Sequence, residues 1–176
     1  MFTKILLNID SPLALADICS SALIKEYSAN KRIKLSYWKV KNDVEEYLYS
    51  IIPEPLRESA ELMCCSITGP GLAVPHIDFG VMSKINYYFG NDNSITNFHK
   101  LKNGDNNIIY PGEERGRIYN LDDLYTTGHF VANQYDAYIL NVSEIHSVRI
   151  LSRETRWMLT YSFSDVPYSE LIKLLS

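Results

Sequence analysis

Cysteine is scarce in this sequence, and the few cysteines present form no recognisable pattern. The 176 residues include three, Cys19, Cys64 and Cys65. The adjacent pair cannot readily bridge to each other, and no spacing typical of a cysteine-ligated metal is present. The sequence therefore argues against a disulfide-built scaffold. It predicts buried, free thiols in a protein of a reducing compartment.

Long apolar runs and an excess of basic charge are also missing. No run approaches the length that spans a membrane, and Ile5-Leu6-Leu7 is followed at once by Asn8 and Asp10, so no signal-peptide core forms. The formal net charge is -4, which argues against a broad electrostatic surface for nucleic acid or anionic membrane. We therefore expect a cytoplasmic protein with neither kind of partner. The net charge argues against a broad basic surface but not against a local basic pocket.

The composition that is present is that of a globular protein. Hydrophobic residues make up 46% of the chain and charged residues 22%, and the length fits one domain with a proper core. The chain has no internal repeat and no linker. We predict a single domain over residues 1–176, with mostly helical support in 1–60, a β core in 61–165 and a C-terminal helix in 166–176.

Two amphipathic helices are predicted in the N-terminal third. The first begins at Asp10-Ser11-Pro12, a typical cap followed by proline. Its apolar face would contain Leu15, Ile18, Cys19, Ala22 and Leu23. A short β-type run follows from Arg32 to Val40. Asn42-Asp43 then caps the second helix, which Pro53 and Pro55 end. Its apolar face would contain Val44, Tyr47, Leu48 and Ile51.

From residue 61 onward the pattern changes to short strands, rich in β-branched and aromatic residues and separated by turn residues. The eight predicted strands are Leu62–Thr68, Leu72–Asp78, Lys84–Phe89, Ile95–His99, His129–Ala132, Ala137–Val142, Ile145–Ile150 and Arg156–Phe163. Such a series favours a sandwich or jelly roll. Pro167–Leu175 predicts a docked helix. The Asn/Asp/Gly-rich segment Gly90–Arg117 is typical of a functional or mobile loop.

Pro75-His76-Ile77-Asp78 is the sharpest local motif. Side chains alternate along a strand, so His76 and Asp78 point to the same face. His146, within Glu144–Val148, is the best candidate for a third ligand. Two histidines and one carboxylate on one side of a metal leave positions open opposite them. This is the facial triad of non-haem Fe(II) oxygenases.

Arg156 lies at the head of the last predicted strand, after His146 in the sequence. If it faces inward, Met158, Thr160 and Ser162 do so as well, while Trp157, Leu159, Tyr161 and Phe163 pack on the other side. An inward arginine beside a metal suits the distal carboxylate of a keto-diacid. Asn86 and Tyr88 share a strand face with Lys84, and they could bind co-substrate or substrate if that face is interior.

Other polar residues carry weaker signals. Arg153 competes with Arg156, but its polar turn favours a solvated side chain. His99 and His129 are predicted to be structural or exposed. Asn141-Val142-Ser143 fits the glycosylation pattern, which the missing secretory signal discounts.

The order His-x-Asp, His146-Ser147-Val148, Arg156 resembles the 2-oxoglutarate/Fe(II)-dependent dioxygenase superfamily. The aspartyl/asparaginyl and prolyl hydroxylase-like branches are nearest, including compact forms found in phages and marine bacteria. The resemblance covers the C-terminal part of the chain. It implies a mainly β fold with flanking helices, a double-stranded β-helix (jelly roll, cupin-like). It also implies Fe(II), the co-substrates 2-oxoglutarate and dioxygen, and hydroxylation of a C–H bond in a small molecule, amino acid or peptidyl side chain.

By this resemblance His76, Asp78 and His146 are the iron ligands, and Arg156 anchors 2-oxoglutarate. Each residue also has a simpler interpretation: the His-x-Asp pair on the surface, His146 in the core, or Arg156 paired with Glu154 or Asp165. Two other functions stay open. One is a cupin-like metalloenzyme without 2-oxoglutarate, which the lack of a second histidine in the first motif disfavours. The other is a non-catalytic jelly-roll binding module with a vestigial site.

Overall fold

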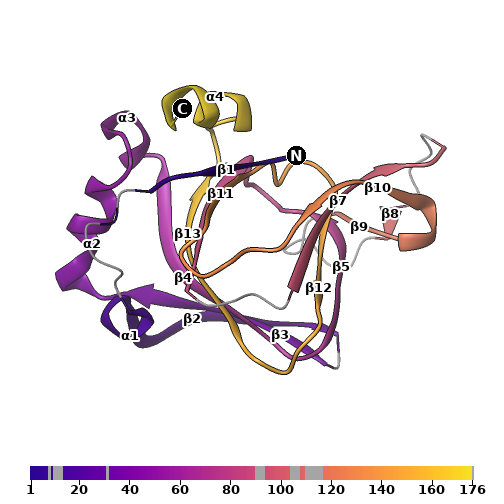
Figure 1. Ribbon diagram of the computed structural model, residues 1–176, viewed down its shortest axis with the longest axis horizontal. Helices are drawn as coiled ribbons and strands as arrows, with labels where there is room; N and C mark the ends of the chain where they lie inside the picture. The colour runs from indigo at the N-terminus through magenta and orange to yellow at the C-terminus, as the bar shows by residue number, and fades with distance from the viewer. Residues whose placement is uncertain are drawn as a thin grey trace.

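The structure is a computed structural model that describes residues 1–7, 9, 14–30, 32–89, 94–103, 108–109 and 117–175. Two antiparallel β-sheets enclose an interior, and most of the helices lie at one side of the molecule (Figure 1). None of the helices in these residues is long and apolar enough to cross a membrane.

Sheet A has seven strands, in the order β1 (Phe2–Ile5), β11 (Ala137–Leu140), β6 (Ser83–Tyr88), β13 (Arg156–Phe163), β4 (Ala60–Thr68), β3 (Ile33–Val40) and β2 (Cys19–Asn30). Sheet B has six, in the order β10 (Leu124–Phe130), β7 (Ser94–Leu101), β12 (His146–Ile150), β5 (Gly71–Ile77), β9 (Arg117–Tyr119) and β8 (Ile108–Ile109). From β4 to β7, and again from β10 to β13, consecutive strands alternate between the sheets. The fold is a jelly roll, as predicted.

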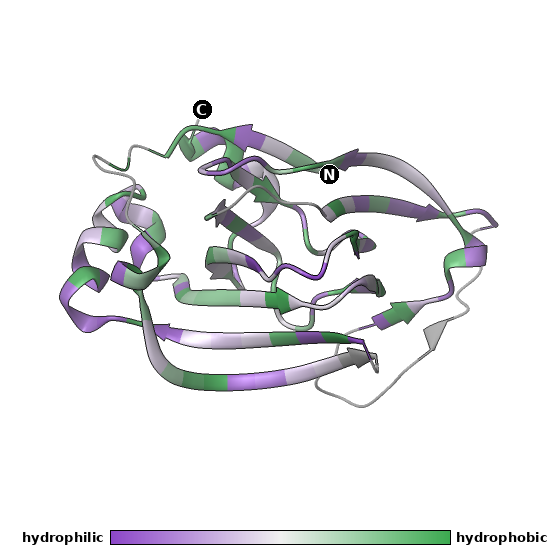
Figure 2. Cartoon of the chain, turned by 60° about the horizontal axis from the view of Figure 1, so that its bottom comes forward, coloured by the Kyte–Doolittle hydropathy of each residue, from purple (hydrophilic) through white to green (hydrophobic). Residues whose placement is uncertain are grey.

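The helices cover the outer face of sheet A. They are α1 (Leu15–Ile18), α2 (Asn42–Ser50), α3 (Glu54–Arg57) and α4 (Tyr168–Leu175), with a 3₁₀ turn at Leu121–Asp123. Leu159 and Phe163 of β13 are fully buried against this layer, in one cluster with Leu48 and Leu171. The hydroxyl of Tyr161 donates to the carbonyl of Leu48 at 2.8 Å. Figure 2 shows hydrophobic and hydrophilic residues interspersed along the strands. Successive side chains of a strand point to opposite faces of its sheet.

A second core lies between the sheets. Tyr88 of sheet A and Phe130 of sheet B meet edge to face, with ring centroids 6.4 Å apart. Phe130 also stacks on Tyr138, with centroids 4.1 Å apart. These aromatic contacts fix the spacing of the two sheets beside the candidate site.

The prediction of a long first helix is wrong. Within the described part of this segment, helical structure covers Leu15–Ile18, and Cys19–Asn30 forms strand β2 on β3. Register shifts occur between Cys19 and Leu23 and again between Leu23 and Lys25. These bulges break the period-2 alternation, and the apolar positions fall by chance at helical spacing. Leu23, placed on the buried helix face, is 47% exposed. The predicted start at Asp10-Ser11-Pro12 lies outside the described residues.

Residues 1–60 are therefore not mostly helical, because they supply β1, β2 and β3. The second helix is confirmed as α2. Pro55 does not end it but lies in the short helix α3, near the N-terminus where proline is tolerated.

The eight predicted strands are all present. Arg156–Phe163 has the predicted ends, the other seven have shifted ends, and the predicted C-terminal helix is α4. The strand predicted at His129–Ala132 begins earlier, at Leu124. Within Gly90–Arg117 the described residues form β7, β8 and the start of β9, and the remainder lies outside the described residues.

The turn between β4 and β5 packs closely on the β2–β3 hairpin. Gly69 has φ +101°, and a Cβ at this position would lie 1.8 Å from the carbonyl oxygen of Arg32. Only glycine permits this approach. The contact holds the hairpin beside β5, which carries the first part of the candidate site.

Candidate metal centre and adjoining cavity

The two predicted histidine ligands come from neighbouring strands of sheet B. His76 on β5 and His146 on β12 are direct cross-strand partners, and the centroids of their rings are 4.4 Å apart. Asp78 follows the end of β5, where its backbone N–H donates to the carbonyl of Val142 at 3.2 Å. Strand pairing therefore brings together residues that are far apart in the sequence.

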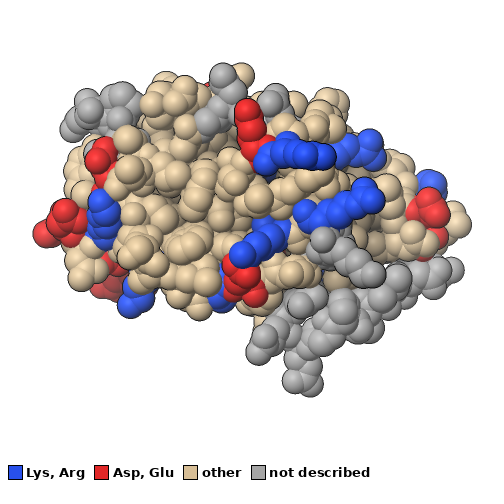
Figure 3. All heavy atoms as spheres, turned by 90° about the horizontal axis from the view of Figure 1, so that it is seen from below, with Lys and Arg blue, Asp and Glu red and all other residues tan. Residues whose placement is uncertain are grey.

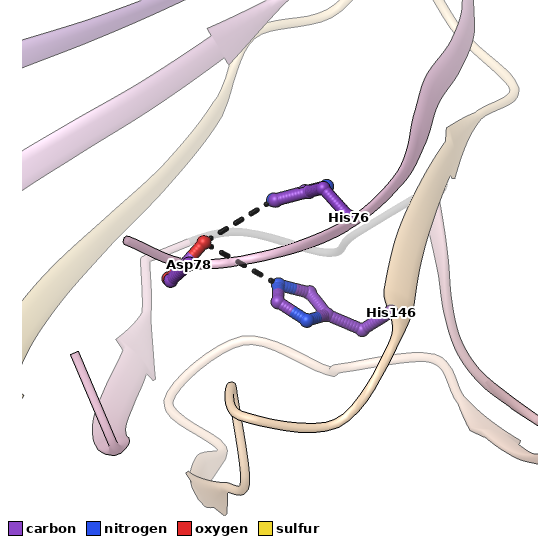
Figure 4. Close-up of side chains that lie close together, drawn as sticks. All are labelled: His76, Asp78 and His146. Carbon is purple, nitrogen blue, oxygen red and sulfur yellow. Dashed lines mark ion pairs between the residues drawn. The ribbon is translucent and has the colours of Figure 1, made fainter. Parts of the chain in front are cut away.

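The three side chains point toward one another (Figure 4). Asp78 Oδ1 lies 3.3 Å from His76 Nε2 and 3.7 Å from His146 Nε2. One ligand atom from each residue lies within 4.8 Å of the others. Two nitrogen donors and one carboxylate oxygen suit a first-row divalent metal such as iron.

The other ring nitrogen of each histidine is held by the backbone. His76 Nδ1 lies 2.8 Å from the carbonyl oxygen of Val74. His146 Nδ1 lies 3.0 Å from that of Glu144. In each case Nδ1 donates to the carbonyl oxygen, so Nε2 is the ring nitrogen that faces the cluster. Metal-binding histidines are oriented in this way by their backbone partners.

The two imidazoles differ in their affinity for protons. Burial, with the neighbouring His76, lowers the pKa of His146 to about 3. Burial would also lower the pKa of His76, but the hydrogen bond to Asp78 and the charge of that carboxylate outweigh burial and raise it. His146 is therefore neutral at physiological pH, the form that binds a metal.

Asp78 has a second charged neighbour, Lys84 of β6. Lys84 Nζ lies 2.5 Å from Asp78 Oδ2, and only 14% of the lysine side chain is exposed. Burial would raise the pKa of Asp78, but the ammonium group of Lys84 and the hydrogen bond from His76 hold it well below its usual range. Burial likewise opposes the charge of Lys84, and Asp78 raises its pKa overall. Both groups are therefore charged.

A cavity of about 260 Å³ is lined by the three candidate ligand side chains and by further residues of both sheets. Arg156, which is 7% exposed, lies in its wall. The guanidinium carbon lies 4.6 Å from the ring centroid of Tyr88, and Nη2 donates to Thr96 Oγ1 at 3.2 Å. The inward orientation of Arg156, Met158, Thr160 and Ser162 is confirmed, because all four line the cavity.

Asn86 and Tyr88 also line the cavity, so their predicted face is interior. Thr160 Oγ1 donates to Asn86 Oδ1 at 2.5 Å, and Asn86 Nδ2 donates to the hydroxyl of Tyr88 at 3.4 Å. Thr160, Asn86 and Tyr88 thus form a connected row of hydrogen-bonded groups in the cavity wall, and the Arg156 guanidinium lies over the ring of Tyr88.

Comparison with known proteins identifies the fold. No family model matches the sequence, and no curated protein matches it. Among solved structures, Escherichia coli YcfD aligns over 98% of this chain and 52% of its own, with a TM-score of 0.51 at 12% identity. A structure described as the E. coli ribosomal oxygenase YcfD covers 98% and 50%, with a TM-score of 0.50 at 12% identity. The fold is similar to that of YcfD.

The chain spans about half the length of YcfD. At 12% identity the similarity to YcfD concerns the fold, and function has to be argued from the residues of this chain.

The remaining predicted polar residues do not line the cavity. His99 is buried, with Nε2 2.8 Å from Ser147 Oγ, so it is structural, and burial lowers its pKa. His129 and Arg153 are exposed, as predicted. The alternative pairing of Arg156 on the surface is excluded by its burial.

Sequence reasoning missed two parts of the cavity wall. Lys84 was named only as a neighbour of Asn86, although its place in the Lys84-x-Asn86-x-Tyr88 alternation could have shown that it points inward. Lys25 and Tyr37 also line the cavity. They come from β2 and β3. The contribution of β2 was missed because part of this segment was predicted to be a helix.

The net negative charge is unevenly distributed. Lys and Arg side chains gather on one part of the face seen from below (Figure 3), the side on which β2 and β3 lie in Figure 1. Lys25 and Lys34 of these strands are exposed. The protein therefore has a locally basic surface near the cavity, which Lys25 also lines, although its net charge is negative.

Proposed function

We propose that this protein is a non-haem Fe(II) oxygenase that uses 2-oxoglutarate and dioxygen to hydroxylate a C–H bond. The observation that carries the proposal is the placement of a His-Asp-His cluster and a buried arginine in one cavity. The cluster offers metal ligands, and the arginine offers a fork for a carboxylate. The similarity of fold to YcfD, which is described as a ribosomal oxygenase, is consistent with this proposal.

His76, Asp78 and His146 would hold the iron, each through one of the atoms that already face one another. Bound iron would supply activation of dioxygen together with the keto acid. The contribution of the chain is to orient the ligands, because the carbonyls of Val74 and Glu144 fix the two imidazoles before metal arrives. Pre-organised ligands need no rearrangement on binding.

Arg156 would bind the distal carboxylate of 2-oxoglutarate. Its guanidinium rests on the ring of Tyr88 and is fixed at Nη2 by Thr96. A rigid guanidinium in a buried wall binds a carboxylate strongly and with a defined orientation. Asn86, whose Nδ2 donates to the hydroxyl of Tyr88, would hydrogen-bond the same co-substrate together with that hydroxyl.

The substrate would enter beside Phe79, which lines the cavity and is 71% exposed. Part of the cavity is apolar, with walls from Leu35, Ile67 and Val148. A volume of about 260 Å³, shared with the co-substrate, suits a small molecule, an amino acid or one peptidyl side chain.

A second candidate is a jelly-roll binding module that does not use iron. The observation that favours it is the ion pair between Lys84 and Asp78, because it neutralises the buried carboxylate without a metal. Under either function we place the protein in the cytoplasm, since Cys64 and Cys65 are buried free thiols.

An anaerobic absorption titration tests the proposal. Fe(II) is added to the metal-free protein and 2-oxoglutarate follows, and we expect a weak visible charge-transfer band only when both are present. In His146→Ala, Fe(II) affinity should fall more than ~100-fold. Mutation of a residue that only hydrogen-bonds to a metal ligand already lowers metal affinity by about 10- to 100-fold, and His146 would be a ligand itself. Absence of both Fe(II) binding and the band in the wild-type protein would reject the oxygenase and favour the binding module.

A further inference from the structure

The two oxygens of Asp78 face different partners. Oδ1 is the atom near both imidazoles, at 3.3 Å from His76 Nε2 and 3.7 Å from His146 Nε2. Oδ2 lies 2.5 Å from the ammonium group of Lys84. The carboxylate is therefore divided between the cluster, on sheet B, and a buried cation on sheet A.

The backbone does not fix this orientation by itself. Asp78 lies beyond the last residue of β5, and its backbone N–H donates to the carbonyl of Val142. Lys84 reaches it from β6, where pairing with Leu140 on one side and Ser162 on the other holds the lysine in place.

The other two cations of the cavity wall contact different groups. Lys25 Nζ lies 4.8 Å from the ring centroid of Tyr37, and the Arg156 guanidinium carbon lies 4.6 Å from that of Tyr88. Among the cavity-lining residues that the structure describes, Lys84 is the cation that forms an ion pair with Asp78.

We infer that Lys84 is a positioning residue, which holds Asp78 Oδ2 so that the carboxylate presents one oxygen to the metal. The inference rests on the proposed metal centre. Carboxylates bind metals through one oxygen or through two. A second oxygen on the metal would occupy a position that the keto acid needs, so Lys84 keeps the centre open for the co-substrate.

The charge of Lys84 has a second effect. A buried ammonium group beside the ligand repels a divalent cation, and this repulsion is large where water is excluded. We expect this repulsion to outweigh what positioning of the carboxylate adds to metal affinity. Lys84 therefore weakens metal binding while it preserves co-substrate binding, and these opposite directions are the signature of the role.

Two substitutions separate position from charge. Lys84→Met removes both the donor and the charge, whereas Lys84→Gln removes the charge and keeps a donor for Oδ2. Lys34→Met is the matched control, because Lys34 forms a 2.7 Å ion pair with Glu26 on an exposed part of the same sheet. Cooperative thermal unfolding followed by circular dichroism shows which variants are folded.

The measurement is calorimetric titration of metal-free protein with Co(II), followed by titration of the Co(II)-loaded protein with 2-oxoglutarate. We expect Lys84→Met to bind Co(II) roughly tenfold more tightly and 2-oxoglutarate roughly tenfold more weakly than wild type. Lys84→Gln should bind Co(II) more tightly with nearly wild-type affinity for 2-oxoglutarate. Lys34→Met should match the wild type in both titrations.

Unchanged or weaker Co(II) binding by both folded Lys84 variants overturns the inference. So does an equal loss of 2-oxoglutarate affinity in both variants, whatever their Co(II) affinity, because Lys84 would then bind the keto acid itself. In either case a wild-type protein that binds Co(II) leaves the proposed metal centre standing. If neither wild type nor Lys84→Met binds Co(II), the metal centre fails together with the inference.

Discussion

Strand β13 contributes to two very different surfaces. On its outer face Leu159, Tyr161 and Phe163 are fully buried against the helices. On its inner face Arg156 and Thr160 line the cavity, with Met158 and Ser162. The outer side chains are aromatic or aliphatic, and the one hydroxyl, of Tyr161, is satisfied by the carbonyl of Leu48. The inner face keeps groups that can bind a ligand.

The two faces of β13 contribute to different properties of the protein, namely stability and ligand binding. Burial of large apolar side chains on the outer face stabilises the fold. Polar groups on the inner face contribute less, because each gives up water for one protein partner. A mutation on the outer face should therefore affect the free energy of unfolding, and one on the inner face should chiefly affect ligand binding.

The largest expected effect is on the outer face. Phe163→Ala should lower the free energy of unfolding by about 3–5 kcal/mol, because a fully buried ring is replaced by a cavity. Urea denaturation measures this loss. Thr160→Val on the inner face is the comparison. It removes one hydrogen bond to Asn86, and should lower the free energy by only about 1–2 kcal/mol. Equal losses in the two variants would break the distinction between the faces.

The next effect is on the inner face. Arg156→Met should weaken 2-oxoglutarate binding by about 10- to 100-fold, because this is the affinity that a charge-assisted hydrogen-bonded pair typically contributes. Co(II) affinity should stay within about twofold of wild type, since Arg156 contacts Tyr88 and Thr96 rather than the ligands. Calorimetry on the metal-loaded protein measures both quantities. Undiminished 2-oxoglutarate affinity would remove Arg156 from the proposed site.

The smallest effect is at the edge of sheet A, in the ion pair of Lys4 and Asp136, at 2.6 Å. Burial would raise the pKa of Asp136, but Lys4 lowers it. The folded-state pKa thus lies below the ordinary 3.8, so the pair stabilises the protein above this pH and the benefit is lost as pH falls through the lowered pKa. Because Lys4 is half exposed, the contribution is at most ~1 kcal/mol.

Urea denaturation between pH 5 and pH 2 measures this contribution, with pH values chosen to span the ordinary carboxyl range. Asp136→Asn should lose the part of the acid dependence that the pair supplies. An unchanged pH profile in the variant would show that the exposed pair does not stabilise the fold.

Much of the site could be predicted because it follows from strand alternation. The pair His76 and Asp78, and the inward face of β13 that begins with Arg156, needed only a period of two. Prediction of His146 required an additional step, namely the knowledge that a histidine and a carboxylate on one strand need a third ligand from elsewhere in the chain to complete a metal site. The jelly roll followed from the series of short strands, which is a regional pattern and tolerates errors at the strand ends.

The rest depends on tertiary contacts that no local pattern contains. Strand β2 could not be predicted, because its bulges interrupt the period of two and its apolar residues recur at helical spacing. Strand β1 is short and is held by pairing with β11. The ion pair of Lys84 with Asp78 joins the two sheets, and its existence depends on how they face each other. The stack of Arg156 on Tyr88 likewise depends on the register of β6 against β13.

The direct pairing of His76 with His146 has a consequence for the folding of the chain. A metal held by both would act as a cross-link between β5 and β12, whose meeting closes a long loop and is intrinsically slow. The unfolded chain has no such site, so bound metal stabilises only the folded state, in proportion to the logarithm of its free concentration. The melting temperature of a preparation should therefore follow its metal content.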